Sequence, residues 1–423
     1  MTKKIIVIIG LLTSFIGFTQ ENTSSPYSFY GLGDIKFRGT EDARAMGGLS
    51  FAGDSISLNL LNPASYSSLK LTSFGVGSTS NFNKISNSEA SEKAKRTTLD
   101  YIAIGVPVGK FGAAFGLMPY SAVGYKIENT YTDLNSLERN ERFTGIGNIN
   151  RVFIGTGYEF NKNFSIGADI QYNFGTIENE AVEFVSDAIF EDNIQLGSRE
   201  RNTSNISGLS ANLGLLYNKK LNEKINLYSS LTYSPESKLN STNTRNIATA
   251  TYNPITGTEF VNDSRDIEVA NTKLVIPSKL SLGAGIGETN KWLIGTEVTF
   301  QSSSNQNNRF DDVTAASFEN SQKYTVGGYY IPKYDSFSNY LNKIVYRAGF
   351  RYEKTGLVIN NQSINDYGMN FGVGLPVTYS KINIGVEFGK RGTTTNGLIE
   401  ENYFNLSIGL SLSDKWFRKR KID

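Results

Sequence analysis

The chain of 423 residues contains no cysteine and no histidine. Without cysteine there are no disulfide bonds, no lipid anchor on a cysteine and no thiolate metal ligands. Without histidine the chain lacks the most common zinc ligand and the usual base that activates a serine or cysteine nucleophile. We therefore expect neither an enzyme nor a bound metal or cofactor, and we predict no catalytic residues.

The chain also lacks a charge of one dominant sign, since 42 Lys and Arg residues face 40 Asp and Glu residues. A protein without a large basic field is not expected to bind nucleic acid. After the N-terminus there is no apolar run long enough for a transmembrane helix. If the protein lies in a membrane, it crosses it as a β-barrel, whose strands carry apolar residues only at alternate positions.

The N-terminus has the features of a secretory signal. Lys3 and Lys4 precede a short apolar run, IIVIIGLLTSFIGF, over residues 5–18. A basic start, a short apolar run and small residues after it are typical of a signal peptide. We predict that residues 1–20 form a cleaved signal peptide, with an N-terminal membrane anchor as the alternative. A secreted barrel belongs in the outer membrane.

From Leu71 onward apolar and polar residues alternate, as they do in strands with one apolar face. The clearest case is FSIGADIQYNF at 164–174, in which every second side chain is apolar. About fourteen such segments are predicted, an even number as in bacterial single-chain barrels. They cover 71–82, 99–108, 111–118, 146–160, 164–174, 209–217, 225–233, 280–286, 292–300, 324–331, 344–352, 367–375, 382–388 and 404–412.

The links between these segments alternate in length. Short links at 109–110, 161–163 and 288–290 contrast with long links at 175–205 and 234–273. Short periplasmic turns and long external loops are typical of an outer-membrane barrel, whereas a soluble β-sandwich has no reason to sort its loops in this way. We predict an all-β fold, a transmembrane antiparallel up-and-down barrel over residues 70–417, followed by a basic periplasmic tail at 418–423.

Proline cannot donate a ladder hydrogen bond, so prolines in such a chain mark strand ends or local breaks in the wall. Four of them fall at the ends of predicted strands, and each marks either a simple strand end or a local break in the wall: Pro119, Pro277, Pro332 and Pro376.

Residues 21–69 do not alternate and are rich in small and aromatic residues. Their core is DARAMGGLSFAGDSISLNLLNPASY at 42–66, which contains a predicted short helix near 42–46. Asp42 is expected to cap this helix, and Gly47 or Gly48 to end it. The density of apolar side chains indicates packing against a partner surface. We predict that residues 21–69 form a hatch or plug inside the barrel.

The run Ala43-Arg44-Ala45-Met46-Gly47-Gly48, with Ala52, Asp54 and the later Asn62-Pro63-Ala64 corner, resembles the N-terminal hatch of FadL-type outer-membrane transport proteins, especially their PorV-like branch in Bacteroidota. The likeness lies in motifs over the first 70 residues and in architecture beyond them. It implies a plugged barrel that hydrophobic molecules leave sideways through a gap in the wall. The hatch and ligand residues implied are Phe29, Tyr30, Met46, Gly47, Gly48, Phe51, Asn62, Pro63 and Ala64.

Charged residues also fall on the polar faces of the predicted strands, where burial is costly unless they pair or stay hydrated. We interpret them as an ion-pair lattice that clamps the plug, with selection of a solute as the alternative. Glycines of the predicted strands at 283–287 and 372–374 are expected to give the plug room. Acidic residues at 263–266 and 311–312 lack a calcium-loop spacing, so no metal site is predicted. The charged lumen residues are Asp169, Glu297, Arg347, Arg351, Asp366 and Glu387.

Two functions remain open. The first, towards which the sequence leans, is a channel for hydrophobic or amphiphilic small molecules, with an apolar cavity beside Phe29, Tyr30, Met46 or Phe51 and a lateral or axial exit. The second is a non-transporting accessory barrel in an outer-membrane complex, either a type 9 secretion translocon or the barrel-assembly machine. The expected partners are outer-membrane lipid and either a hydrophobic ligand or other protein subunits, and no nucleic acid.

Overall fold

The computed structural model describes residues 22–52, 55–134, 137–186, 195–253, 258–310, 316–336, 339–378 and 380–414. The predicted signal peptide, the basic tail, Asp54 and the acidic pair at 311–312 lie outside these residues. Within the described ranges, no helix combines the length and the hydrophobicity needed to cross a membrane.

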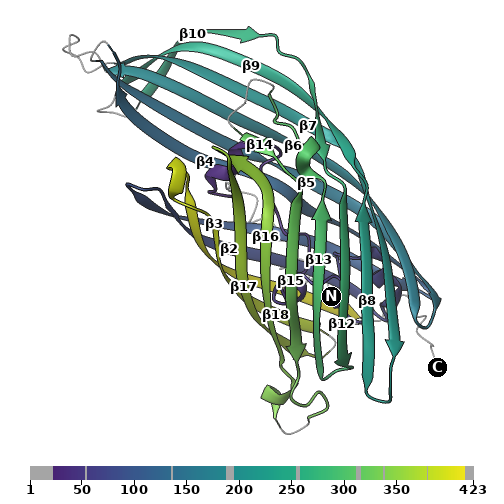
Figure 1. Cartoon of the computed structure of the whole chain (residues 1–423). Helices are drawn as coiled ribbons and strands as arrows, with labels where there is room; N and C mark the ends of the chain where they lie inside the picture. Colours follow the sequence, from purple (N-terminus) through teal and green to yellow (C-terminus); the bar gives the residue numbers. More distant parts are fainter. Residues whose placement is uncertain are drawn as a thin grey trace, which may run out of the picture.

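In the described part of the chain, fourteen antiparallel strands close into one barrel (Figure 1), which confirms the predicted fold. The first and last wall strands, β2 (Thr72–Ser86) and β19 (Glu400–Asp414), pair along their whole length and close the circuit. The other wall strands are β3 (Ser91–Val108), β4 (Phe111–Thr132), β5 (Glu138–Asn161), β6 (Phe164–Ser186), β7 (Gln195–Lys220), β8 (Ile225–Ser234), β12 (Lys279–Glu288), β13 (Trp292–Gln301), β15 (Ser321–Tyr330), β16 (Val345–Ile359), β17 (Gln362–Val377) and β18 (Ser380–Gly392).

The alternation of the sequence becomes the two faces of the wall. On β6, Ile170 and Tyr172 are 59% and 49% exposed on the outer face, whereas Asp169 and Gln171 are almost fully buried inside. An outer surface of exposed aliphatic and aromatic side chains suits lipid, and a polar inner surface suits water or a packed polar interior. One end of the barrel carries short turns, such as the one between β12 and β13. We call it the short-turn end and the opposite end the long end.

Much of what was predicted as long loops is strand. Strands β5 and β7 reach 24 and 26 residues, where about 10 suffice to cross a membrane. The link at 234–273 forms β9 (Ser237–Asn253), β10 (Thr258–Ile267) and the start of β11 (Thr272–Ile276), and β9 pairs with β7. Together these strands form a wall that rises from one side of the long end (Figure 1).

This one-sided wall is strongly curled. Arg142 of β5 and Glu259 of β10 form an ion pair of 2.7 Å, although β6, β7 and β9 lie between their strands in the sheet. The opposite side of the barrel stays short, because β12 and β13 have 10 residues each and β14 (Ala316–Phe318) only three. The barrel is therefore markedly asymmetric at its long end.

Residues 22–69, here called the N-terminal segment, contain little regular structure. They form η1 (Pro26–Phe29), β1 (Asp34–Ile35), α2 (Glu41–Arg44) and η2 (Pro63–Ser68). The expected cap of α2 was misplaced: Thr40, with an extended backbone, occupies the N-cap position and its hydroxyl donates to the Asp42 carboxylate. Gly47 and Gly48 follow the helix with φ of 75° and 101°, values that favour glycine, so the predicted glycine stop is confirmed.

Candidate functional site

The middle of the N-terminal segment packs against inward-facing positions of the wall. Met46, Phe51 and Ala64 belong to a buried apolar cluster with Leu216 and Leu293. A Cβ added to Gly285 or Gly295 would lie 2.6 or 2.4 Å from the Phe51 ring. Wall glycines therefore make room for the segment, as predicted. Met46 and Phe51 are 3% and 5% exposed, so they fill space instead of lining a cavity.

The Asn62-Pro63-Ala64 corner is fixed to β6 and β7. The Asn62 side chain accepts a hydrogen bond from the Ala64 amide and donates one to the Leu215 carbonyl, each at 3.0 Å. A Cβ on Gly167 would lie 2.4 Å from backbone atoms of Pro63. Because backbone cannot move aside as a side-chain tip can, this contact requires glycine in the wall.

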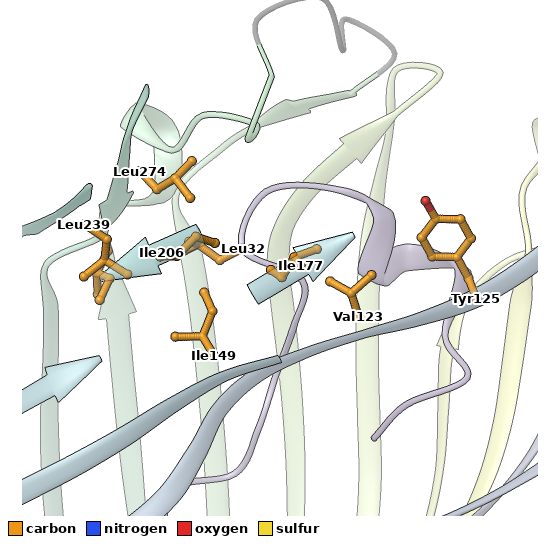
Figure 2. Packing of buried hydrophobic residues seen from close by; sticks show 9 residues of the cluster. Leu32, Val123, Tyr125, Ile149, Ile177, Ile206, Leu239 and Leu274 are labelled. Atoms are coloured by element: carbon orange, nitrogen blue, oxygen red, sulfur yellow. The ribbon is translucent and has the colours of Figure 1, made fainter. Parts of the chain in front are cut away.

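The first part of the segment is held at the long end. Phe29 contacts Tyr30 and Tyr125 edge to face, with ring centroids 5.0 and 5.7 Å apart. Arg309 donates hydrogen bonds to the carbonyl oxygens of Gly31 and Phe29 at 2.6 and 2.8 Å. Close by is a buried cluster formed by side chains of the segment and of the wall (Figure 2), comprising Leu32, Val123, Tyr125, Ile149, Ile177, Ile206, Leu239, Leu274 and Ile276.

Two of the six predicted lumen charges contact the segment directly. The Asp169 carboxylate accepts from the Arg38 guanidinium at 2.6 Å, and the Glu297 carboxylate accepts from the Ser50 amide at 2.7 Å. Both carboxylates lie on strands far apart around the barrel, β6 and β13. This part of the arrangement agrees with an ion-pair lattice that clamps the segment.

The other four lumen charges bind mainly within the wall. Arg351 donates to Glu387 at 2.9 Å, to Asp366 at 3.2 Å and to the Tyr403 hydroxyl at 2.6 Å. Arg347 donates to the Asn383 side chain at 3.1 Å. These contacts place the four groups in polar networks between β16, β17, β18 and β19.

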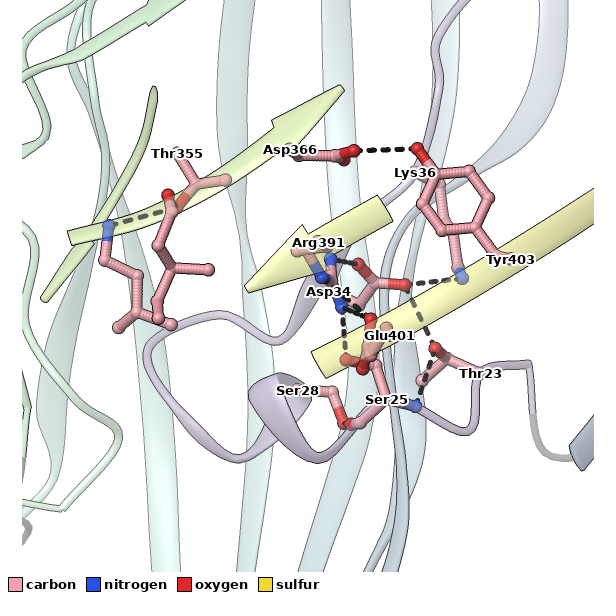
Figure 3. A network of polar contacts seen from close by, with 12 residues as sticks. Thr23, Ser25, Ser28, Asp34, Lys36, Thr355, Asp366, Arg391, Glu401 and Tyr403 are labelled. Carbon is pink, nitrogen blue, oxygen red and sulfur yellow. Dashed lines mark hydrogen bonds and ion pairs between the residues drawn. The ribbon is translucent and has the colours of Figure 1, made fainter. Parts of the chain in front are cut away.

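An unpredicted ion cluster joins the segment to the wall (Figure 3). Arg391 contacts Asp34 at 2.8 Å and Glu401 at 2.9 Å, and Lys36 contacts Asp34 at 3.0 Å. Burial by itself would raise the pKa of Asp34, but the charges and hydrogen bonds of Lys36 and Arg391 lower it well below its ordinary value. Asp34 and Lys36 do not lie on an alternating strand. Arg391 and Glu401 fall between the predicted strands at 382–388 and 404–412, so the sequence pattern did not single out these four residues.

A second unpredicted cluster surrounds α2. Arg44 contacts Asp100 at 3.2 Å and Glu41 at 3.5 Å. Glu41 is only 1% exposed. This burial raises the pKa of its carboxyl group to about 8; the charge of Arg44 opposes the rise and the charge of Asp100 adds to it. The arrangement holds two carboxylates and one guanidinium in close contact, with Glu41 buried and with the side chains of Arg44 and Asp100 slightly exposed.

A cavity of about 390 Å³ lies between the N-terminal segment and the wall. Tyr30 and Gly47 border it, but Phe29, Met46 and Phe51 do not. Its lining mixes apolar and charged side chains, so it is not the apolar cavity that the channel interpretation predicted. The lining includes Ile35, Phe37, Leu61, Lys36, Arg38, Arg44, Asp100, Lys279, Lys323 and Arg391.

The wall has a break beside this cavity. The ladder between β3 and β4 extends only from Val108 opposite Phe111 to Ile102 opposite Leu117. Beyond it, β3 pairs with β2 alone, and β4 has a register shift against β5 at Pro119. Pro119 was expected at a strand end but lies inside β4, where its missing N–H accompanies a local break instead. Figure 1 shows the β2–β3 hairpin and β4 diverging.

The N-terminal segment partly covers this break. Its short strand β1 pairs with β4, with Asp34 opposite Ala122 and Ile35 opposite Ser121. Ile35 is 50% exposed and, like Asp100 of β3, borders the cavity. The cavity therefore extends to the place where the two wall strands separate.

The described residues contain no group of three or more acidic side chains placed to hold a metal ion. The acidic run at 263–266 lies within β10 of the curled wall, where the Asp266 carboxylate accepts a hydrogen bond from the Asn246 side chain of β9 at 2.8 Å. Asp266 thus takes part in a cross-strand contact.

Comparison with solved structures gives barrels of similar fold. The Pseudomonas putida toluene transporter TodX is 15% identical with a TM-score of 0.57, covering 91% of this chain and 100% of that chain. A Pseudomonas aeruginosa FadL homologue is 12% identical with a TM-score of 0.58, covering 90% and 99%. The CymD monoaromatic hydrocarbon channel is 13% identical with a TM-score of 0.54, covering 90% and 98%. Identities this low show a shared fold alone.

In sequence, none of the curated proteins matches the chain. The PorV-like assignment stays a prediction from the motif resemblance. One family model, BamG, matches residues 1–423. The chain therefore belongs to the BamG family and has the barrel fold of the FadL-type hydrocarbon channels.

Proposed function

We propose that the protein is a non-transporting accessory barrel of an outer-membrane protein complex, in which the N-terminal segment acts as a fixed plug. The observation that carries the proposal is that the segment is bonded to the wall along its length. Asp34 binds Arg391, Arg38 binds Asp169, and Ser50 binds Glu297. Removing one partner of a buried ion pair leaves a costly unpaired charge, so these contacts oppose movement of the plug.

The chemistry of the cavity supports the same proposal. A hydrocarbon entering it would displace water from the charged groups of Arg38, Arg44 and Lys279 without replacing their hydrogen bonds. Such desolvation is unfavourable for a purely apolar ligand. Membership in the BamG family favours the barrel-assembly machine over a type 9 secretion translocon as the complex. The predicted signal peptide and the lipid-compatible outer surface support location in the outer membrane.

A second function is favoured by the break between β3 and β4. The cavity that reaches this break has apolar groups, Ile35 and Phe37, and basic groups, Lys279 and Lys323. This combination suits an amphiphilic small molecule with an acidic end, which would leave sideways through the break. In that case the plug has to move or the cavity has to open during each passage.

A disulfide lock distinguishes the two functions. The side-chain oxygens of Ser50 in the plug and Ser230 in β8 are 2.8 Å apart, and those of Ser281 in β12 and Thr299 in β13 are also 2.8 Å apart. The chain has no cysteine, so Ser50→Cys with Ser230→Cys places one disulfide between plug and wall. Ser281→Cys with Thr299→Cys is the matched control, because its disulfide ties wall to wall.

For an accessory subunit, cells carrying the plug lock should grow and assemble outer-membrane proteins as the control does, and extraction in mild detergent should yield a complex larger than the monomer. Uptake that is lost in the plug lock, kept in the control and restored by reduction would establish the channel instead. A monomer without partners in gentle extraction would also contradict the accessory role.

A further inference from the structure

Three aromatic side chains form a row on the outer face of β18, β19 and β2. Phe388 and Phe404 are directly opposite in one ladder, and Phe404 and Phe82 in the next. Their ring centroids are 5.0 and 5.9 Å apart. Towards the short-turn end, the outward positions of β19 are aliphatic: Leu406, Ile408, Leu410 and Leu412. The row therefore marks the edge of the lipid-facing band that is nearer the long end, where aromatic girdles lie.

Two lysines occupy the next outward positions towards the long end, and a third lies level with the aromatic row. Lys84 and Lys93 are directly opposite each other on β2 and β3, and Lys95 is opposite Phe82, with its ammonium 5.2 Å from the ring centroid. We call Lys84, Lys93 and Lys95 the lysine patch. Like charges directly opposite on neighbouring strands destabilise a sheet. The ammonium groups of Lys84 and Lys93 repel each other, and a bound anion would reduce this repulsion.

Neighbouring acids neutralise the patch only in part. Glu400 lies on the same face but is held by Lys390 at 2.7 Å and by the Asn402 amide at 2.8 Å, with Lys84 within its electrostatic reach. No hydrogen bond or ion pair joins the Lys84 or Lys93 side chain to another residue in the described ranges. Glu92 alternates with Lys93 and so projects from the opposite face of β3.

We propose that the lysine patch binds a phosphate group of an outer-leaflet glycolipid of the lipid A type, whose acyl chains lie along Phe82, Phe404 and Phe388. The depth of the patch, directly above the aromatic row, is the depth of lipid headgroups. The long end faces outside in bacterial barrels, where this leaflet carries phosphorylated glycolipid. A phosphate supplies several acceptor oxygens, and clustered lysines at a membrane surface attract anionic headgroups.

The test uses the full-length protein purified in mild detergent, with lipid binding followed by native mass spectrometry. Lys84→Gln/Lys93→Gln/Lys95→Gln is compared with Lys110→Gln/Lys162→Gln/Lys224→Gln, which removes three exposed lysines at the short-turn end. Bisphosphorylated lipid A should bind the patch variant at least about tenfold more weakly than the native protein. The control variant should bind it as the native protein does, and dephosphorylated lipid A should bind all three proteins weakly.

Equal binding of lipid A to the native protein and the patch variant would overturn the proposal, as would equal losses in both variants. Tight binding of dephosphorylated lipid would show that the acyl chains alone are recognised. Displacement of lipid A by millimolar inorganic phosphate would assign the site to free phosphate. Removing like charges should not lower the thermal unfolding midpoint of the patch variant. If the midpoint does fall, the single variant Lys93→Gln replaces the triple variant and should weaken lipid A binding severalfold. Unchanged lipid A binding by Lys93→Gln would reject the proposal.

Discussion

At the residue scale, glycine decides how closely the N-terminal segment approaches the wall. A Cβ on Gly167 would meet the Pro63 backbone at 2.4 Å. We expect Gly167→Ala to destabilise the barrel by about 1–3 kcal/mol, as overpacking does. Ala168→Leu is the control, because this neighbour projects from the opposite face of β6. Thermal unfolding in detergent measures both variants, and equal midpoints would contradict the predicted contact.

The Asp34–Arg391–Glu401 cluster is expected to be a strong residue-scale anchor. Arg391→Gln leaves two largely buried carboxylates without their guanidinium, which typically costs about 3–5 kcal/mol. Adding Glu401→Gln to this variant removes the carboxylate that Arg391 alone pairs within the described ranges, and should recover part of the loss. Asp34, in contrast, keeps its contact with Lys36. Unfolding midpoints of the two single variants and the double variant test the coupling. Additive effects would show that the two side chains act independently.

Glu41 should make stability depend on pH, because burial raises its pKa from 4.5 to about 8. Below pH 4.5 the carboxyl group is neutral in both folded and unfolded chains. Between pH 4.5 and about 8, the Glu41 carboxyl group is ionised in the unfolded chain but still protonated in the folded protein. The free energy of unfolding therefore decreases as the pH rises through this range. The unfolding midpoint should fall between pH 5 and 8 in the native protein and fall less in Glu41→Gln. Equally steep falls would refute the assignment.

At the scale of elements, the break between β3 and β4 should be visible in backbone exchange. Residues 91–101 of β3 pair with β2 on one side only, whereas the residues of β2 that face them pair on both sides, with β3 and β19. Backbone amides without a hydrogen-bond partner on a neighbouring strand need less local unfolding to exchange their hydrogen with water, so they exchange faster. Hydrogen exchange with mass spectrometry should show peptides from 91–101 exchanging well ahead of peptides from 72–86. Equal protection would mean that the break is closed in solution.

The alternation of residues predicted the fourteen wall strands because lipid on one side and a polar lumen on the other impose a period of two. Beyond the membrane that contrast ends, and both faces of a strand carry charge, as Glu180 and Glu183 do on β6. The strand extensions were therefore mistaken for loops. Asp169 and Glu297 could be placed inside from parity alone, but Arg391 and Asp34 pair across 357 residues. No local pattern specifies such a contact.

At the scale of the whole molecule, the barrel has the fold of hydrocarbon channels, but its N-terminal segment is held in the lumen by buried ion pairs as well as by apolar packing. The plug lock tests the lumen, the gentle extraction tests the outer wall as a whole, and the lipid measurements test one part of that outer wall, the lysine patch. A protein that keeps its role with an immobile plug, and acts through its outside, would use this fold as a scaffold instead of a passage.

The seam between β2 and β19 also constrains the order of folding. These strands come from the two ends of the wall, so the barrel closes only after almost the entire chain has been delivered. Contacts of such high sequence separation form slowly. The N-terminal segment, made first, therefore has to wait in place while the wall grows around it, or be threaded through the opening beside β4 afterwards. The last strand to arrive seals in the first segment that was made.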